Sequence, residues 1–232
     1  MFQILTLAVL LQALPAKAPK EMALSGVVKL NPPFPKVREN RALMSDDKCA
    51  NCYKVPPPKD DLVLDEEGRV KGAFAVITKG LEGRTFKPPP EEVVLDQKGC
   101  LYQPRVLGVQ VGQRLLIRNS DAFMHNVHGL GFANPEFNWG QPPNQDMVKV
   151  FKSPELMLRL KCEIHPWMSA FVGVVEHPYF AVSDAQGRFE IKGLPAGKYS
   201  LTVWHERAEK IVREIEAPLK EPLKFVLTLR KD

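Results

Sequence analysis

Proline is the feature that most constrains the fold of this chain. The 232 residues include 21 prolines, about 9% where ~5% is usual, and clusters occur at 56–58 and 88–90. Because proline lacks a backbone donor and clashes with the preceding helical turn, it interrupts long helices. A helical bundle, a coiled coil and a TIM barrel are therefore disfavoured. The sequence predicts many short strands joined by loops.

The charge balance argues against a nucleic-acid partner. The chain has 32 lysines and arginines against 27 aspartates and glutamates, a net charge of +5. No run of five basic residues occurs, and binding to a phosphate backbone needs clustered cations rather than a small excess. The charged residues are interpreted as solvated surface, and we predict no nucleic-acid binding.

The N-terminus has the pattern of an export signal. Residues 4–14 are apolar and are followed by Ala16, Lys17 and Ala18. This apolar run is too short for a membrane-spanning helix, which needs about 20 residues, but it suits a signal-peptide core with an A-x-A-like cleavage site. We therefore predict a signal peptide over 1–18, export to the periplasm or the extracellular space, and no transmembrane segment in the mature chain. A buried N-terminal strand is the alternative.

Short apolar and alternating runs predict the strands. Residues 35–61 are interpreted as a long proline-rich loop, and 132–144 as a second loop. Residues 206–216 suit a helix or a strand, and we predict a strand over 211–215. The other predicted strands are 24–30, 62–64, 72–78, 93–95, 102–113, 114–118, 147–151, 157–161, 170–175, 179–182, 189–191, 199–203 and 223–229.

One segment has a chemically specific pattern. Cys162, His165 and Met168 follow one another at spacings of three on a loop between two predicted strands, and His125 lies upstream at the end of another. Two histidines, one cysteine and a weak axial methionine are the ligands of a blue-copper site. Thiolate and thioether favour Cu(I), whereas imidazole accepts both oxidation states. A site that suits neither state fully changes little on electron transfer.

The segment 162–168 resembles the copper-binding loop of cupredoxins, specifically the compact Cys-x-x-His-x-x-Met loop of amicyanin-like proteins, including Pro166 after the second histidine. The stretch 119–128 is similar to the first-histidine motif of that family. The resemblance implies one type 1 copper ion with the ligands His125, Cys162, His165 and Met168.

The same resemblance implies roles for residues around the ligands. Asn126, whose backbone N–H would point at the thiolate sulfur, and Asn119 are expected to tune the site. In cupredoxins the second histidine lies near the surface in an apolar patch, which makes Pro166 and Trp167 the expected electron port beside His165. Phe132, Pro142 and Pro143 are expected to lie beside this apolar patch. His128, His177 and His205 are not expected to be copper ligands.

The remaining cysteines suggest one disulfide bond. Cys49 and Cys52 form a C-x-x-C motif, but Tyr53 stands where covalent haem attachment needs histidine. A local bridge between these two cysteines is one possibility. The stretch 26–100 resembles a longer subgroup of exported plastocyanin-like proteins, which implies instead a bridge from Cys49 or Cys52 to Cys100.

The C-terminal residues carry a second pattern. Asp184-x-x-Gly-x-Phe-x-Ile is followed by Leu194-Pro-Ala-Gly-x-Tyr-x-Leu-x-Val, which resembles the carboxypeptidase regulatory-like (transthyretin-like) β-sandwich. About 50 residues are few for an independent core. We therefore expect this module to borrow a strand from the N-terminal part, around residues 26–30.

Together these features predict an all-β protein. A cupredoxin-like Greek-key β-sandwich is expected over 24–177 and a small transthyretin-like β-sandwich module over 178–232. The predicted function is that of an exported one-electron carrier with an unidentified redox partner protein. The positive net charge of the chain favours an acidic partner. The alternatives are a copper carrier or scavenger and a β-sandwich interaction protein without a redox role. An enzyme is disfavoured, because a complete ligand set leaves no open position for substrate.

Overall fold

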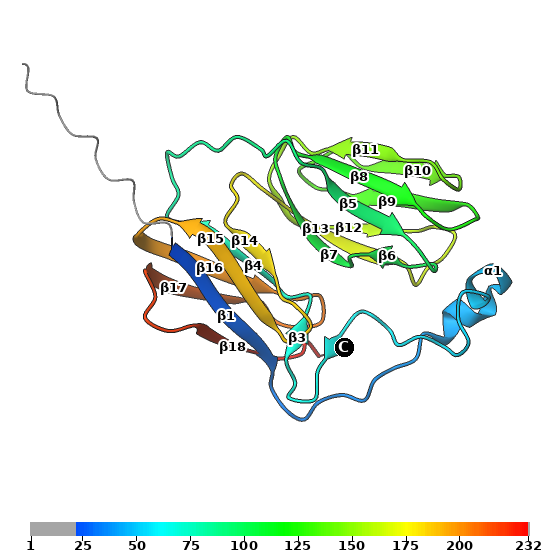
Figure 1. Cartoon of the computed structure of the whole chain (residues 1–232), viewed down its shortest axis with the longest axis horizontal. Coiled ribbons are helices and arrows are strands. Elements are labelled where there is room, and N and C mark those ends of the chain that lie inside the picture. The colour runs from blue at the N-terminus through cyan, green and yellow to red at the C-terminus, as the bar shows by residue number, and fades with distance from the viewer. Residues whose placement is uncertain (1–21, 232) are drawn as a thin grey trace, which may run out of the picture.

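A computed structural model describes residues 22–231, and β-strands dominate that part of the chain (Figure 1). The all-β prediction is therefore confirmed. The predicted signal peptide, residues 1–18, lies outside the described residues. Within 22–231, no helix combines the length and apolar character that crossing a bilayer requires.

The described elements follow one another along the chain as short segments. They are β1 (Met22–Leu30), η1 (Arg41–Ser45), α1 (Asp47–Ala50), β2 (Val63–Leu64), β3 (Val70–Lys71), β4 (Phe74–Lys79), β5 (Val93–Gln97), β6 (Tyr102–Gln103), β7 (Val106–Gln110), β8 (Arg114–Asn119), β9 (His125–Leu130), β10 (Phe137–Gln141), β11 (Met147–Val150), β12 (Glu155–Lys161), β13 (Ser169–Val175), β14 (Phe180–Val182), β15 (Arg188–Leu194), β16 (Gly197–Trp204), β17 (Ile211–Ala217) and β18 (Leu223–Leu227).

The first unit is a pair of mixed sheets. One has the strand order β10-β9-β12-β13-β7 and the other β11-β8-β5-β6. In each sheet one pair is parallel, β7 with β13 and β5 with β8. Alternate residues of these strands, such as Leu115 and Ile117 of β8, are fully buried between the sheets. This packing gives the unit one continuous apolar core.

The second unit packs the sheet β15-β1-β18 against the sheet β14-β4-β16-β17. The alternation along β15 leaves Phe189, Ile191 and Leu194 inside and charged residues outside, as expected for a sheet with one solvated face. These side chains share a core with residues of β1, β4, β16 and β18. Figure 1 shows this unit beside the first.

Strands from both sides of the expected boundary at residue 177 build the second unit. β1 pairs with β15 and with β18, which confirms the borrowed strand. β4 was expected in the copper-binding unit, yet it pairs with β14 and β16. Ala75 and Ile77 face the second core, whereas Phe74 and Val76 face the first unit. With both faces covered, β4 shows a run of buried residues rather than alternation.

The two units meet at an apolar seam. Phe74 and Phe180 stack with centroids 5.6 Å apart, and their rings lie against Gly108 and Gly173, which are cross-strand partners in β7 and β13. Side chains larger than hydrogen at these two positions would occupy the space of the rings. The glycine pair therefore makes the recess that receives the second unit.

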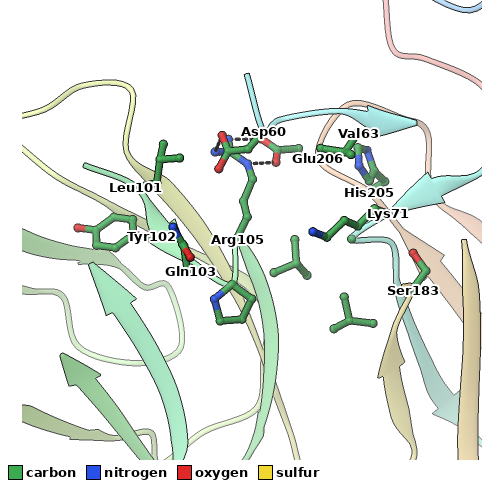
Figure 2. Close-up of a pocket in the computed structure, with 14 residues that line it drawn as sticks. Asp60, Val63, Lys71, Leu101, Tyr102, Gln103, Arg105, Ser183, His205 and Glu206 are labelled. Atoms are coloured by element: carbon green, nitrogen blue, oxygen red, sulfur yellow. Dashed lines mark hydrogen bonds and ion pairs between the residues drawn. The ribbon is translucent and has the colours of Figure 1, made fainter. Parts of the chain in front are cut away.

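A polar cluster and a cavity of about 460 Å³ lie beside the seam (Figure 2). Arg105, next to β7, donates from Nη1 to Asp60 (2.7 Å) and from Nη2 to Glu206 (2.8 Å), and it also pairs with Glu206 through Nε. These side chains are mostly buried. The cluster joins three distant parts of the sequence.

Two predicted loops contain regular structure. β10 lies within 132–144 and pairs with β9; the surrounding glycine and prolines conceal its short alternation. The loop 35–61 carries η1 and α1. In the ambiguous segment 206–216, the residues from Ile211 onward belong to β17, which pairs with β16, so tertiary pairing selects the strand over the helix.

Candidate metal centre

Three strands deliver the predicted ligands to one end of the first unit. His125 is the first residue of β9, Cys162 directly follows β12, and Met168 directly precedes β13. β12 lies between β9 and β13 in the sheet, so the ends of neighbouring strands meet. The loop is closed by hydrogen bonds from Met168 N to His165 O (2.9 Å) and from Cys162 N to Met168 O (3.3 Å).

The donor atoms form a tight, buried group. Ligand atoms of His125, Cys162 and His165 all lie within 4.8 Å of one another. The two histidine Nδ1 atoms are 3.0 Å apart, and Cys162 Sγ lies 3.7 Å from His165 Nδ1. The four predicted ligands are all buried, none exposing more than 3% of its surface. Met168 and Cys162 belong to the same cluster of buried apolar side chains.

These separations fit a single soft metal ion. Metal–nitrogen bonds of about 2.0 Å and metal–sulfur bonds of about 2.3 Å allow one ion to reach two nitrogens 3.0 Å apart and a sulfur 3.7 Å away. Two imidazoles, a thiolate and a nearby thioether are a donor set that suits copper. The residues present therefore fit a copper ion.

The cysteine is prepared to act as a thiolate. Burial by itself raises the pKa of Cys162, but hydrogen bonds from His125 and His165 and from the loop backbone outweigh burial and lower the pKa to about 6. A thiol in such surroundings loses its proton readily near neutral pH. A metal ligand must be deprotonated, so this shift favours metal binding.

Asp121 orients His125. Its Oδ2 atom lies 2.8 Å from His125 Nε2, and its carboxylate also accepts hydrogen bonds from Gly99 N (2.7 Å) and Cys100 N (2.9 Å). Burial opposes protonation of His125, whereas the bonds with Asp121 and Cys162 raise its pKa. Holding Nε2 directs Nδ1 toward the other ligands. This role of Asp121 was not predicted from the sequence, in which the spacing of four between Asp121 and His125 was the available signal.

The two asparagines shape the backbone around the ligands. Asn126 Oδ1 accepts a hydrogen bond from Glu163 N (3.0 Å), which ties β9 to the 162–168 loop. Asn119 donates to Phe123 O (2.9 Å) and accepts from Asp121 N (3.1 Å), fixing the turn that leads to His125. These are side-chain contacts to the backbone; the expected approach of the Asn126 backbone N–H to the Cys162 sulfur, and the tuning of the site by Asn126 and Asn119, stay predictions.

A disulfide bond lies against the site. Cys49 is bonded to Cys100, while Cys52 is an exposed thiol and Cys162 a buried one. This confirms a bridge to Cys100 and identifies Cys49 as its partner. A ring nitrogen of His165 lies within 4.8 Å of both bridge sulfurs, and Cys100, Asp121 and His125 form another such group.

His165 lies almost wholly beneath the surface, at the base of a hollow that Asp46, Met124 and Ile164 also line. Only 3% of the residue is exposed, and Asp46 Oδ2 lies 3.8 Å from its Nε2 atom. Asp46 is the N-cap of α1, so the segment that contains η1 and α1 provides this cover. The role of His165 as an electron port stays a prediction. Sequence reasoning missed Asp46 because it is distant along the chain.

The remaining patch residues are divided between two places. Pro166 is exposed, whereas Trp167 is half-buried and donates from Nε1 to Cys100 O (3.1 Å). Met124 and Ile164, 52% and 48% exposed, are the large apolar side chains beside His165. Pro142 and Pro143 follow Gln141, which pairs with His125 in the sheet. Phe132 lies beyond the opposite end of β9, and so it is not a neighbour of the site.

The other three histidines have their own partners. His128 lies between the carboxylates of Glu136 and Glu163, whose hydrogen bonds raise its pKa. His177 Nδ1 accepts from Tyr179 N (3.2 Å), and His205 Nδ1 accepts from Arg207 N (3.2 Å). None of the three belongs to the ligand group around His125 within the described residues.

Comparisons with solved structures give partial similarities. A copper-containing nitrite reductase (NirK) from Thermus scotoductus SA-01 is 22% identical with a TM-score of 0.35, and the match covers 43% of this chain and 25% of the reductase. A point mutant of amicyanin in its reduced state is 23% identical over 43% of this chain and 97% of amicyanin, with a TM-score of 0.33. A purple cupredoxin from Nitrosopumilus maritimus is 20% identical over 36% of this chain and 97% of its own, with a TM-score of 0.31.

No protein-family model and no curated protein matches this sequence. The chain is therefore similar to these copper proteins over less than half of its length, at values that do not place it in a family. The geometry of its own site carries the functional argument.

Proposed function

We propose that this chain is an exported type 1 copper protein that carries one electron at a time. The observation that supports this most is the buried donor group, in which ligand atoms of His125, His165 and Cys162 lie within 4.8 Å of one another. A copper ion bound there supplies a Cu(I)/Cu(II) couple. The chain holds the donors in place from three strand ends, which keeps the site nearly unchanged between oxidation states.

The surroundings support a redox site rather than an exchangeable one. All four proposed ligands are buried, and Asp121 fixes the orientation of His125. The low pKa of Cys162, about 6, provides a thiolate at neutral pH. The burial of these four side chains would keep water and competing ligands from a bound copper ion.

The proposal is tested by adding Cu(II) to the mature, metal-free protein and recording visible absorption. We expect an intense thiolate-to-copper band that ascorbate bleaches and that Cys162→Ser abolishes. Cys52→Ser is the matched control, because it removes the other free thiol, which is exposed, and should leave the band unchanged. A missing band in the wild type, or a band that survives Cys162→Ser, would refute a type 1 site.

Electron exchange separates a carrier of electrons from a carrier of copper. The copper-loaded reduced protein is mixed with a small acidic electron acceptor in its oxidised form. We expect the copper protein to be oxidised rapidly without release of copper. Transfer of copper to a chelator at a comparable rate, with slow oxidation, would favour the copper carrier or scavenger instead.

Several further expectations belong to this proposal. The Cys49–Cys100 disulfide supports export, since such bonds persist in oxidising compartments. We infer an acidic redox partner that docks near Met124, Ile164 and Pro166, and a transthyretin-like character for the C-terminal module. Cell fractionation and crosslinking of the purified protein to candidate acidic redox proteins would test the location and the partner.

A further inference from the structure

Two bonded cysteines lie beside the metal centre, and a third cysteine closely follows one of them in the sequence. Cys49 and Cys100 are bonded to each other, and Cys52 is a free, exposed thiol three positions after Cys49. A ring nitrogen of His165 lies within 4.8 Å of both bridge sulfurs. The proposed copper function uses none of these three cysteines.

The backbone places Cys49 within bonding range of either partner. Cys52 N donates to Cys49 O (3.1 Å) across one turn, and such a turn brings its end residues within about 7 Å, measured between Cα atoms. Disulfides span about 4.4–6.8 Å between Cα atoms, and Cys49 and Cys100 are 5.6 Å apart. A Cys49–Cys52 bond is therefore compatible with the backbone turn, but it requires Cys52 Sγ to leave Lys48 O, which it contacts at 3.6 Å, and to rotate toward Cys49.

The bridge holds a cover over His165. We call residues 41–53, which contain η1 and α1, the cover segment; it lies at the tip of a long connection between β1 and β2 (Figure 1). Leu43 is buried against the first unit, and Tyr53 donates to Gly99 O (2.7 Å). Asp46 lies over His165 Nε2 at 3.8 Å. The only disulfide that attaches this segment to the first unit, among described residues, is Cys49–Cys100.

We propose that Cys49, Cys52 and Cys100 form a thiol–disulfide exchange site that controls access to His165. The Cys52 thiolate attacks Cys49 Sγ, so that the Cys49–Cys52 bond forms while the Cys49–Cys100 bond breaks. Cys100 leaves as a thiolate and takes up the proton that Cys52 released. One disulfide and one thiol are present before and after the step, so no oxidant or reductant is consumed.

The two disulfide states differ in what they constrain. The Cys49–Cys100 bond joins residues 51 positions apart and fixes the cover segment to the first unit. A Cys49–Cys52 bond lies wholly within the cover segment and attaches it to nothing. In that state the segment is held only by side-chain packing and hydrogen bonds, so the Nε2 edge of His165 becomes accessible.

Disulfide mapping tests the exchange in the metal-free mature chain, independently of copper. The protein is incubated with a trace of reduced glutathione as thiol catalyst, quenched, unfolded with N-ethylmaleimide and digested for mass spectrometry. We expect a fraction of molecules with a Cys49–Cys52 bond and an alkylated Cys100. Cys52→Ser should abolish this species. Finding only the Cys49–Cys100 bond with alkylated Cys52 would overturn the proposal.

Histidine modification by diethyl pyrocarbonate tests the uncovering. His165 should be protected in the starting protein and lose protection in the exchanged fraction and in Cys100→Ser. The buried His205 should stay protected throughout, which shows that the chain is folded. If Cys100→Ser does not fold, the modification of His165 is compared between wild-type protein and Cys52→Ser after the same glutathione treatment. Continued protection of His165 in exchanged molecules would refute the control of access.

Discussion

At the residue scale, the candidate site depends on side chains that are not predicted metal ligands. Asp121 bonds to His125 and to the backbone of Gly99 and Cys100, and so it links the disulfide to a ligand. Asp46 approaches the other histidine, His165, but at 3.8 Å and with partial exposure. Position and burial, rather than charge, distinguish these two aspartates.

We predict that Asp121→Asn weakens copper binding by about 10–100-fold, the usual effect of removing a partner that orients a metal-binding histidine. Competition for Cu(I) with a coloured chelator measures the affinity. Asp46→Asn is the control: asparagine keeps the helix cap that Asp46 provides, and we expect a clearly smaller change. Equal losses in the two variants would contradict an orienting role for Asp121.

His205 makes stability depend on pH. Burial, followed by nearby Arg105, lowers its pKa to about 4, so the folded state keeps it neutral where the unfolded state, with a pKa near 6.5, takes up a proton. Stability is therefore full above pH 6.5 and falls as pH decreases toward 4. Integrating the two titrations gives a loss of about 2 kcal/mol at pH 5.

We predict that His205→Gln reduces the fall in unfolding free energy between pH 7 and pH 5, measured by urea denaturation of the metal-free protein. His128 gives the opposite sign, because hydrogen bonds to Glu163 and Glu136 raise its pKa. Its contribution is present at low pH and disappears as pH rises, so His128→Gln should make the fall steeper. A fall that His205→Gln leaves unchanged would show that this histidine is not responsible.

At the element scale, β7 and β13 owe their packing to glycine. Gly108 and Gly173 face each other across the pair, and the rings of Phe74 and Phe180 fill the space where side chains would stand. Glycine usually weakens a strand, and an interior one often marks a close approach. Here the close approach is that of β4 and β14 from the second unit.

We predict that Gly173→Ala destabilises the protein by about 1–3 kcal/mol, because the added methyl group overpacks the seam against Phe74. Gly140→Ala is the matched control: it also lies in a strand, but open space surrounds it, and the change should be neutral or slightly stabilising. Urea denaturation gives both values. Similar effects at the two positions would mean that the seam does not require glycine.

At the scale of the whole molecule, an ion cluster complements the apolar seam. Arg105 binds two carboxylates, Asp60 from the long loop and Glu206 from the second unit. Burial raises the pKa of both carboxyl groups, and Arg105 opposes that rise. Removing the cation leaves two acidic groups largely out of water with no charge to balance them.

We predict that Arg105→Met costs about 3–5 kcal/mol of unfolding free energy, as expected when a buried ion pair loses one partner. Arg114→Met is the comparison, because Arg114 pairs with Glu92 on the surface and should lose less than about 1 kcal/mol. Thermal or urea unfolding distinguishes them. An equally small loss at Arg105 would mean that water enters the cluster and screens it.

Sequence alone determined the local chemistry of this protein. The spacing of Cys162, His165 and Met168 placed three donors on one short loop, because residues so close in the chain stay close in space. The alternation of apolar and polar residues in β15 and β16 likewise indicated strands. β15 has one buried face, whereas five consecutive residues of β16 are buried. These features depend on residues that are close in the sequence, so they can be predicted without knowledge of the fold.

Only the tertiary structure decided the rest. β4 joins the second unit, β10 forms within an expected loop, and the cover segment brings Asp46 over His165. Each outcome depends on partners far away in the chain, whose pairing reflects the total surface buried rather than any local pattern. The sequence indicated the four predicted ligands through two separate motifs, but only packing could determine that the second histidine is enclosed.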